Sequence, residues 1–291
     1  MDGNASPGAM GFQSLLAGTL AKIEIPPRPV LLDKLMAEMQ QDEPDFHRLA
    51  GLIRADVGMS ASLIKTANAP IFGYRSKATT VREALAMLGL IHVLRTLAGI
   101  SLRQAVPETP ELKLFWDTSA RVAYLSGWLV KQVGAKDGIR AEDAYTFGIF
   151  HDCGIPVLIN ALAGYEATYQ LACKEGGRPL TEFETEHHTL NHALVGCALA
   201  QSWLLPQVHV EAILHHHDLA VLSASAADIP VGSRRLIAFG HLAEMLDATA
   251  TGASDHEWQR MGEACLAVLD VSSDRVAELQ AAAIEILKGV E

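Results

Sequence analysis

The sequence Phe147-Gly-Ile-Phe-His151-Asp152-Cys-Gly-Ile-Pro156 places an adjacent histidine and aspartate at the end of an apolar, helix-forming run. Such a pair can give one metal ion a nitrogen and an oxygen ligand, provided that further ligands come from elsewhere in the chain. The later sequence holds these candidates: His187, His188, His192 and the run His215-His216-His217-Asp218. The same His151 and Asp152 could instead form a structural hydrogen-bonded pair, with the aspartate accepting from a helix N-terminus or from a histidine.

Apolar residues recur at three- and four-residue spacing on both sides of this stretch, which is typical of helices that bury one face. The segment Thr80-Val-Arg-Glu83 has the spacing of a capping box and predicts the start of a long helix that runs through Leu102. Thr181-Glu-Phe-Glu184 repeats that spacing and predicts a helix that continues through His192 towards Trp203. No alternation of strands and helices is visible, so the sequence predicts an all-α protein in two helical lobes.

Prolines mark the expected boundaries between these parts. Ile25-Pro-Pro-Arg-Pro29 cannot lie inside a helix, because each proline fixes φ and lacks a backbone donor. The break at Pro107–Pro110 is the best candidate for the boundary between the two lobes. We therefore expect a loose leader over residues 1–24, a first lobe over 25–106, a second lobe over 107–222 and C-terminal helices over 223–291 that pack on the second lobe.

The composition limits the classes of partner. With 49% hydrophobic and 20% charged residues the chain is typical of a soluble globular protein, and its net charge of -11 argues against binding a nucleic acid polymer or an anionic membrane. The most membrane-like segment, Ala84–Leu102, carries His92 and Arg95 near its centre, which favours a buried core helix. A small nucleotide in a locally basic pocket is not excluded by the overall charge.

The cysteines and the N-terminus indicate the cytoplasm. No basic segment followed by an apolar run opens the sequence, so no signal peptide is predicted. The cysteines form no CxxC pair and have apolar neighbours, so we expect buried free thiols in a reducing compartment. They are Cys153, Cys173, Cys197 and Cys265.

Several short segments together carry a resemblance to a known family. They are Ile25-Pro-Pro-Arg-Pro29, Ile53-Arg-Ala-Asp-Val57, Ala67-Asn68-Ala69, Ala84-Leu-Ala-Met-Leu-Gly89, Phe115-Trp116 with Ser119, Gly148-Ile-Phe-His151-Asp152-Cys-Gly154, Glu184 with His192-Ala-Leu-Val-Gly196, Trp203-Leu-Leu-Pro206 and His216-His217-Asp218. In this order they resemble the HDOD domain, a bacterial signalling module related to the HD phosphohydrolases and the HD-GYP phosphodiesterases. The resemblance covers roughly Ile25 to Leu222. It implies a two-lobed helical fold whose second lobe is an HD-like helical bundle.

The chain departs from the catalytic relatives of that family at three places. Thr118 stands where active HD enzymes have an early metal-ligating histidine, Pro156 lies near the place of the HD-GYP lysine, and the GYP segment is missing after His217. What remains is a partial set of metal-ligand candidates: His151, Asp152, His192, His216 and His217. The resemblance implies either no cofactor or a divalent Fe, Mn, Zn or Ni ion in that partial site, and no catalytic residue is assigned.

Neighbouring residues have simpler explanations. Glu184 could bond a metal ligand, but its capping-box position is the favoured explanation. His188 lies four residues before His192 and is expected at the surface, and His215 is expected to be solvated or packed, since three consecutive histidines cannot all face one site. Asn68 is expected to satisfy backbone groups at a helix end, and core packing is expected for Trp116, Trp128 and Trp203.

These observations lead to one main hypothesis and two rivals. The main hypothesis is a non-catalytic signal-transduction module that acts through a signalling protein partner or by sensing a ligand, with a homodimer as one possible assembly. The first rival is a metal-dependent phosphohydrolase of the HD type that acts on a nucleotide or a cyclic dinucleotide. The second rival binds a nucleotide without cleaving it.

Overall fold

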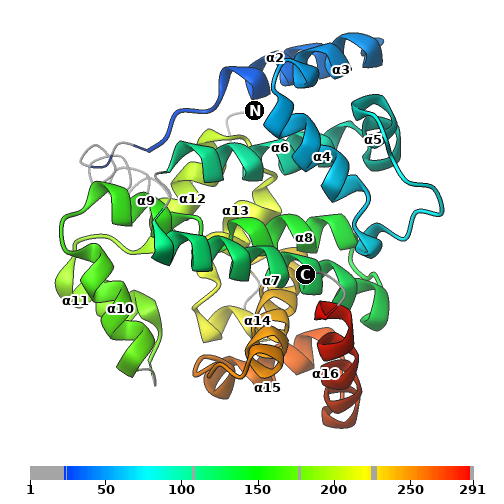
Figure 1. The fold of residues 1–291 in the computed structure, drawn as a ribbon. Helices are drawn as coiled ribbons and strands as arrows, with labels where there is room; N and C mark the ends of the chain where they lie inside the picture. The colour runs from blue at the N-terminus through cyan, green and yellow to red at the C-terminus, as the bar shows by residue number, and fades with distance from the viewer. Residues whose placement is uncertain (1–22, 24, 107–108, 176–177, 224–227, 289–291) are drawn as a thin grey trace, which may run out of the picture.

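The computed structural model of the chain describes Ile23 and residues 25–106, 109–175, 178–223 and 228–288. Every regular element in these segments is a helix and none is a strand, so the predicted all-α class is confirmed. In Figure 1 the first helices lie at one end of the molecule, above the green and yellow helices of the second lobe, and the orange and red C-terminal helices lie at the opposite end. Apart from Ile23, the predicted leader lies outside the described residues.

The first lobe is built of short helices and one longer helix, and three of the short helices start at a side-chain cap. Its elements are α2 (Val30–Met39), α3 (Phe46–Arg54), α4 (Val57–Ala67), the 3-10 turn η1 (Pro70–Phe72), α5 (Val81–Leu88) and α6 (Leu90–Ala105). Asp45 and Asp56 accept hydrogen bonds from the first backbone N–H groups of α3 and α4. Thr80 and Glu83 form the predicted capping box at the start of α5.

The predicted helix from Thr80 through Leu102 is wrong, because the chain turns sharply at Gly89. Gly89 has φ of 76°, a conformation that residues with a Cβ rarely adopt, and it separates α5 from α6 by a bend of 116°. Within the described residues, no helix by itself has both the length and the apolar composition of a membrane span; α5 and α6 pass such a test only as this bent pair.

The second lobe wraps the region of the His-Asp pair. Its elements are α7 (Pro110–Val133), α8 (Ala141–Phe150), α9 (Gly154–Ala161), α10 (Tyr165–Glu175), α11 (Leu180–His187), α12 (His192–Ser202), α13 (Gln207–His215) and η2 (Leu219–Leu222), followed by α14 (Val231–Thr251), α15 (Trp258–Leu269) and α16 (Ser273–Leu287). The long helix α14 packs against α7, α8, α13, α15 and α16 and is buried on most sides.

The capping box predicted at Thr181 and the helix predicted from there through His192 are wrong. Helix α11 starts at Leu180 after Pro179 and ends at His187, and a new helix, α12, starts at His192. The side chain of Asn191 accepts from the Leu194 backbone N–H and caps this new start, while Glu184 accepts from the His192 backbone N–H instead of capping α11. The separation of α11 from α12 leaves His192 at a helix start, facing the His-Asp turn.

A close backbone approach holds α9 against α12. A Cβ on Gly154 would lie 2.0 Å from the carbonyl oxygen of His192 and 2.9 Å from the backbone nitrogen of Gly196. Gly148, on α8, makes a similar approach to α7, where a Cβ would lie 2.5 Å from Cα of Ala123. Only glycine fits at these two positions, so they fix the turn that carries His151 and Asp152 between α7 and α12.

Three of the four cysteines are buried as predicted, but Cys173 is exposed on α10. The tryptophan prediction is confirmed, since Trp116, Trp128 and Trp203 are buried. Trp203 also donates from its indole nitrogen to the carbonyl oxygen of Pro26 at 3.0 Å, which ties the proline-rich lead-in to the second lobe.

Candidate metal centre

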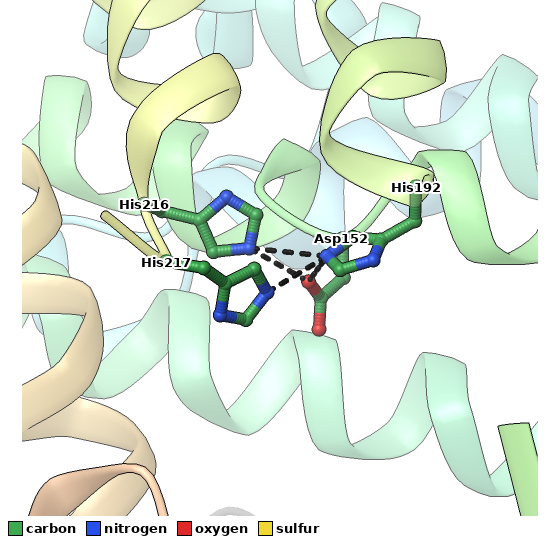
Figure 2. Close-up of side chains that lie close together, drawn as sticks. All are labelled: Asp152, His192, His216 and His217. Atoms are coloured by element: carbon green, nitrogen blue, oxygen red, sulfur yellow. Dashed lines mark hydrogen bonds and ion pairs between the residues drawn. The ribbon is translucent and has the colours of Figure 1, made fainter. Parts of the chain in front are cut away.

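Four side chains of the second lobe converge on one point: Asp152, His192, His216 and His217 (Figure 2). His192 Nε2 lies 3.3 Å from His216 Nε2, 2.9 Å from His217 Nε2 and 3.3 Å from Asp152 Oδ1. Asp152 Oδ1 lies 3.2 Å from His216 Nε2. These residues come from the turn between α8 and α9, the start of α12 and the end of α13, so three packed segments build the cluster.

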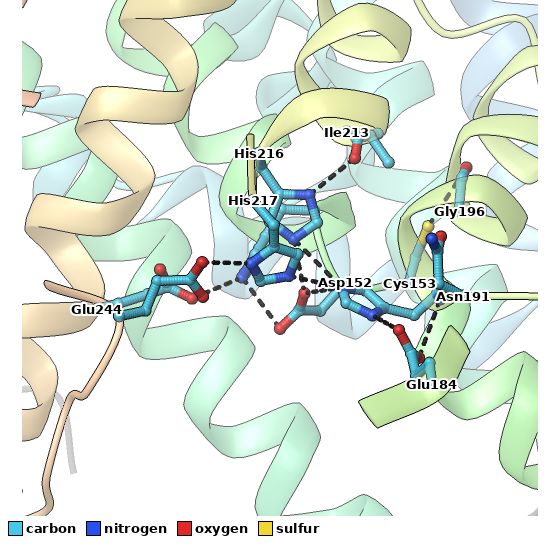
Figure 3. Close-up of polar contacts among 12 residues, drawn as sticks. Asp152, Cys153, Glu184, Asn191, Gly196, Ile213, His216, His217 and Glu244 are labelled. Atoms are coloured by element: carbon cyan, nitrogen blue, oxygen red, sulfur yellow. Dashed lines mark hydrogen bonds and ion pairs between the residues drawn. The ribbon is translucent and has the colours of Figure 1, made fainter. Parts of the chain in front are cut away.

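The other ring nitrogen of each histidine is held by an acceptor. Nδ1 lies 2.8 Å from Glu184 Oε2 for His192, 2.7 Å from the Ile213 carbonyl oxygen for His216 and 2.7 Å from Glu257 Oε1 for His217 (Figure 3). An acceptor requires a proton on Nδ1, so in each neutral ring Nε2 presents its lone pair. Three lone pairs and a carboxylate oxygen therefore face one another, and only positive charge between them relieves their repulsion.

The pKa values of His216 and His192 also indicate that the cluster favours one positive charge. Burial and the neighbouring His217 lower the pKa of His216 to about 3, so this ring is neutral at pH 7. Burial opposes a charge on His192, yet Glu184 and Asp152 raise the pKa of His192 to about 10. In the absence of an ion, a proton on His192 thus takes the place of a cation.

The spacing of the four atoms fits a transition-metal ion. Four ligands at about 2.0–2.1 Å from a tetrahedral metal lie about 3.3 Å apart. Three of the distances found here are 3.2 or 3.3 Å, and the distance from His192 Nε2 to His217 Nε2 is shorter, at 2.9 Å. Imidazole nitrogens with one carboxylate suit zinc, iron, nickel or manganese. Glu184, Ile213 and Glu257 supply the supporting hydrogen bonds that fix the orientation of metal-bound histidines in proteins.

His151 faces a second group rather than this cluster. His151 Nε2 lies 3.3 Å from Asp152 Oδ2 and 3.1 Å from Glu244 Oε1, and His151 Nδ1 donates to the Gly148 carbonyl oxygen at 3.0 Å. Asp152 therefore offers one oxygen to each group. Burial disfavours the charged form of His151, but Asp152 and Glu244 raise the pKa of His151 well above its usual value.

This second group has three ligand atoms and opens on a pocket of about 380 Å³. The pocket is also lined by Thr118, Tyr169 and Lys174. The Thr118 hydroxyl accepts from Arg121 Nη2 at 3.1 Å, and Arg121 pairs with Asp247 at 2.6 Å. At the place where the resemblance implies an early histidine, the chain thus has a hydroxyl bound to a guanidinium, which is a poor metal ligand.

The structure thus brings the five predicted ligands into one region but divides them. Asp152, His192, His216 and His217 form the cluster, and His151 shares only Asp152 with them. The three other histidines that the sequence offered as candidates lie outside both groups: His187 Nδ1 pairs with the Phe183 carbonyl, His188 Nε2 with Thr168, and His215 lies 3.8 Å from Glu211. Of the three consecutive histidines, His216 and His217 lie in the cluster and His215 does not.

Three carboxylates of the site were missed or misassigned from the sequence. Glu184 is fully buried and bonds both His192 and the Tyr165 hydroxyl, so its explanation as a helix cap is wrong. Glu244 on α14 and Glu257 before α15 come from beyond the segments that carry the resemblance, and no local motif marks them. An acidic residue inside a helix that is buried on most sides, as Glu244 is in α14, was the one signal available.

Comparisons with known proteins give the family and the fold. A family model of the HDOD domain matches residues 25–219. An uncharacterized protein of Treponema pallidum is 26% identical over 197 residues, which cover 67% of this chain but only 38% of that protein. The chain therefore spans well under half the length of this curated relative.

Two solved structures have the same fold. The first, a Shewanella amazonensis protein provisionally assigned as a phosphohydrolase, has a TM-score of 0.64 at 19% identity, with 96% of this chain and 98% of that chain covered. The second, a Marinobacter aquaeolei protein provisionally assigned to signal transduction, has a TM-score of 0.58 at 16% identity, with 96% of this chain and 66% of that chain covered.

Proposed function

The chain belongs to the HDOD domain family, and from this premise we propose that it is a signal-transduction module whose second lobe binds one transition-metal ion. One observation carries the metal: three histidine lone pairs and the Asp152 carboxylate converge at ligand spacing, each histidine being held by its own acceptor. Bound there, the ion would supply a fixed positive charge and Lewis acidity.

A regulatory rather than a catalytic role is supported by the difference between the two groups. The cluster offers four ligands of its own, whereas the group of His151, Asp152 and Glu244 offers three beside the Thr118–Arg121 pair. In this proposal Glu184 and Glu257 hold His192 and His217 so that the turn after α8, the start of α12 and the end of α13 are joined through one point. A signalling protein partner would bind the helical surfaces whose positions depend on this metal centre. The partner, a homodimer and the cytoplasmic location stay predictions.

A metal-dependent phosphohydrolase is the second candidate, and the pocket favours it. His151, Asp152 and Glu244 face a space of about 380 Å³ that Lys174 also lines. In that role Lys174 would attract the phosphoryl group of a nucleotide or cyclic dinucleotide, and His151 would hold a proton close to it. The solved phosphohydrolase-like structure supports only the fold of such an enzyme.

The metal content of untagged protein purified without chelator tests the proposal, measured by elemental mass spectrometry. We expect close to one iron, zinc, manganese or nickel ion per chain, its loss in a His192→Ala/His216→Ala variant, and its retention in a His215→Ala variant, whose side chain lies outside the cluster. Folded wild-type protein without metal, even after reconstitution, would contradict the proposal.

A screen of phosphate esters separates the two candidate functions. The reactions would contain manganese, iron, nickel or magnesium. Turnover by the wild type that is lost in His151→Ala would favour the phosphohydrolase. Metal binding without turnover would favour the regulatory module.

A further inference from the structure

A second pocket, of about 290 Å³, lies where the two lobes meet. It is lined by residues of α4 and α6 from the first lobe and of α7 and α8 from the second (Figure 1). None of its lining residues belongs to the metal cluster or to the pocket of Thr118 and Lys174. It is therefore a separate space, and a ligand in it would touch both lobes at once.

The lining is cationic in a chain whose net charge is -11. Lys65, Arg95 and Arg103 contribute to it, and among the described residues no carboxylate does. Arg95 is held by Asp143, with Nη1 2.5 Å from Oδ1, and its buried Nε has no partner among the described residues. Three cationic side chains on one pocket, with no carboxylate among its described lining residues, indicate that the pocket suits an anionic group.

Flat aromatic and small hydroxyl side chains form the remaining walls. Trp116 from α7, a core residue that is 5% exposed, and Tyr145 from α8 are the aromatic residues of the lining, and Thr66 and Thr96 bring hydroxyl groups. Aromatic side chains bind the faces of nucleobases, and hydroxyl groups can bond either the base edges or the sugar. The volume of about 290 Å³ lies just below the range of about 300–1,000 Å³ for small-molecule sites, which suits one base and not two.

We propose that this interlobe pocket binds a nucleoside monophosphate, with the phosphate on Lys65, Arg95 and Arg103 and the base against Trp116 and Tyr145. This binding does not depend on the metal centre. The ligand would nevertheless report to that centre, because Ile149 and Phe150 line the pocket and directly precede His151 in the chain. The lobes are already tight there, since a Cβ on Gly99 would lie 2.8 Å from Cγ2 of Ile149.

The test is a titration of the full chain with adenosine, guanosine, cytidine and uridine 5′-monophosphates. Binding is measured by calorimetry and by tryptophan fluorescence. We expect saturable binding of at least one of them, and binding of inorganic phosphate and of the free nucleoside that is weaker by about tenfold or more. A Lys65→Gln/Arg103→Gln variant should bind about tenfold more weakly. The matched control, Lys77→Gln/Arg82→Gln, removes two exposed cations from the same lobe and should bind as the wild type does.

Further variants locate the ligand. Trp116→Phe should remove most of the fluorescence response while calorimetry still detects binding. No saturable binding of any of the four nucleotides would overturn the proposal. So would equal losses in the two double variants, an unchanged fluorescence response in Trp116→Phe, or affinity for inorganic phosphate equal to that for the nucleotide. Binding lost in His151→Ala and retained in Lys65→Gln/Arg103→Gln would place the ligand in the pocket of Thr118 and Lys174 and would also overturn it.

Discussion

Glu184 shows how one carboxylate can determine the chemistry of a neighbouring ring. It is fully buried and accepts from both the backbone nitrogen and Nδ1 of His192, at 3.0 and 2.8 Å, and from the Tyr165 hydroxyl. These bonds fix the tautomer of His192 and aim its Nε2 at the cluster. The buried carboxylate is therefore explained by its bonds to His192 and Tyr165 rather than by a cap on α11.

We expect Glu184→Gln to lower the affinity for the metal ion by about 10–100-fold, because the amide keeps the shape but loses the negative charge that makes His192 a strong ligand. Competition with a chromophoric chelator measures this change. Glu182→Gln, at an exposed position of the same helix, serves as the control and should leave the affinity unchanged. Equal affinities of the two variants would refute this role of Glu184.

His209 is a buried histidine whose neutral form is favoured in the folded chain. Its Nε2 donates to the Asp143 carbonyl oxygen at 3.0 Å, and its Nδ1 has no partner among the described residues. Burial and the nearby Arg95 lower the pKa of His209 from 6.5 to about 4. Because the unfolded chain then binds more protons than the folded chain between these two values, this residue makes the free energy of unfolding decrease as the pH falls through that window.

The variant His209→Gln keeps a donor for the Asp143 carbonyl and removes the titrating group. We expect its free energy of unfolding to decrease less than that of the wild type between pH 6.5 and 4, by roughly 1–3 kcal/mol. Urea denaturation at a series of pH values measures the difference. The exposed His47, changed to Gln, is the control; a His209→Gln profile parallel to the wild type would disprove the assignment.

At the scale of the helix, the contact of α9 with α12 depends on the missing side chain of Gly154. We expect Gly154→Ala to lower the free energy of unfolding by about 2–4 kcal/mol and to weaken metal binding, since the added carbon meets the His192 backbone and must push Asp152 and His192 apart. Gly51→Ala, in α3 with nothing within 4 Å of the new carbon, should instead be neutral or stabilising by up to about 1 kcal/mol. Thermal unfolding with metal titration compares them; similar effects of the two changes would contradict the close-approach argument.

The helices also show which sequence signals were sufficient. The capping box at Thr80 could be predicted because both partners lie within one turn. The bend at Gly89 could not, because a glycine within an apolar helical pattern does not reveal its φ. Thr181 to Glu184 has the same spacing as the first capping box, but Glu184 bonds His192, eight positions later, instead of capping α11. Local patterns therefore predicted that helices exist but did not predict where they break.

For the whole molecule, sequence motifs indicate some residues of the candidate site, and only the packing of distant helices indicates the others. The helical fold and the candidate ligands His192, His216 and His217 could be proposed from the sequence, because a family resemblance marks their order. Glu244 and Glu257 could not, because only the packing of α14 and α15 on the second lobe brings them to the site.

A metal ion held by several helices should stabilise the whole chain. We expect removal of the ion by a chelator to lower the melting temperature of the wild type by roughly 5 °C or more, because an ion that binds only the folded state adds its binding free energy to folding. Differential scanning calorimetry measures the shift. The His192→Ala/His216→Ala variant should not respond to the chelator, and a response equal to that of the wild type would mean that the ion is bound elsewhere.

The 64 chain positions that separate Asp152 from His216 also have a kinetic consequence. Contacts between such distant residues form late in folding, because the intervening chain must first be ordered. An ion that needs the finished cluster therefore stabilises contacts that the transition state lacks, so it slows unfolding and leaves the refolding rate almost unchanged. The lifetime of the folded lobe, rather than the speed with which it is made, would then depend on whether the ion is present.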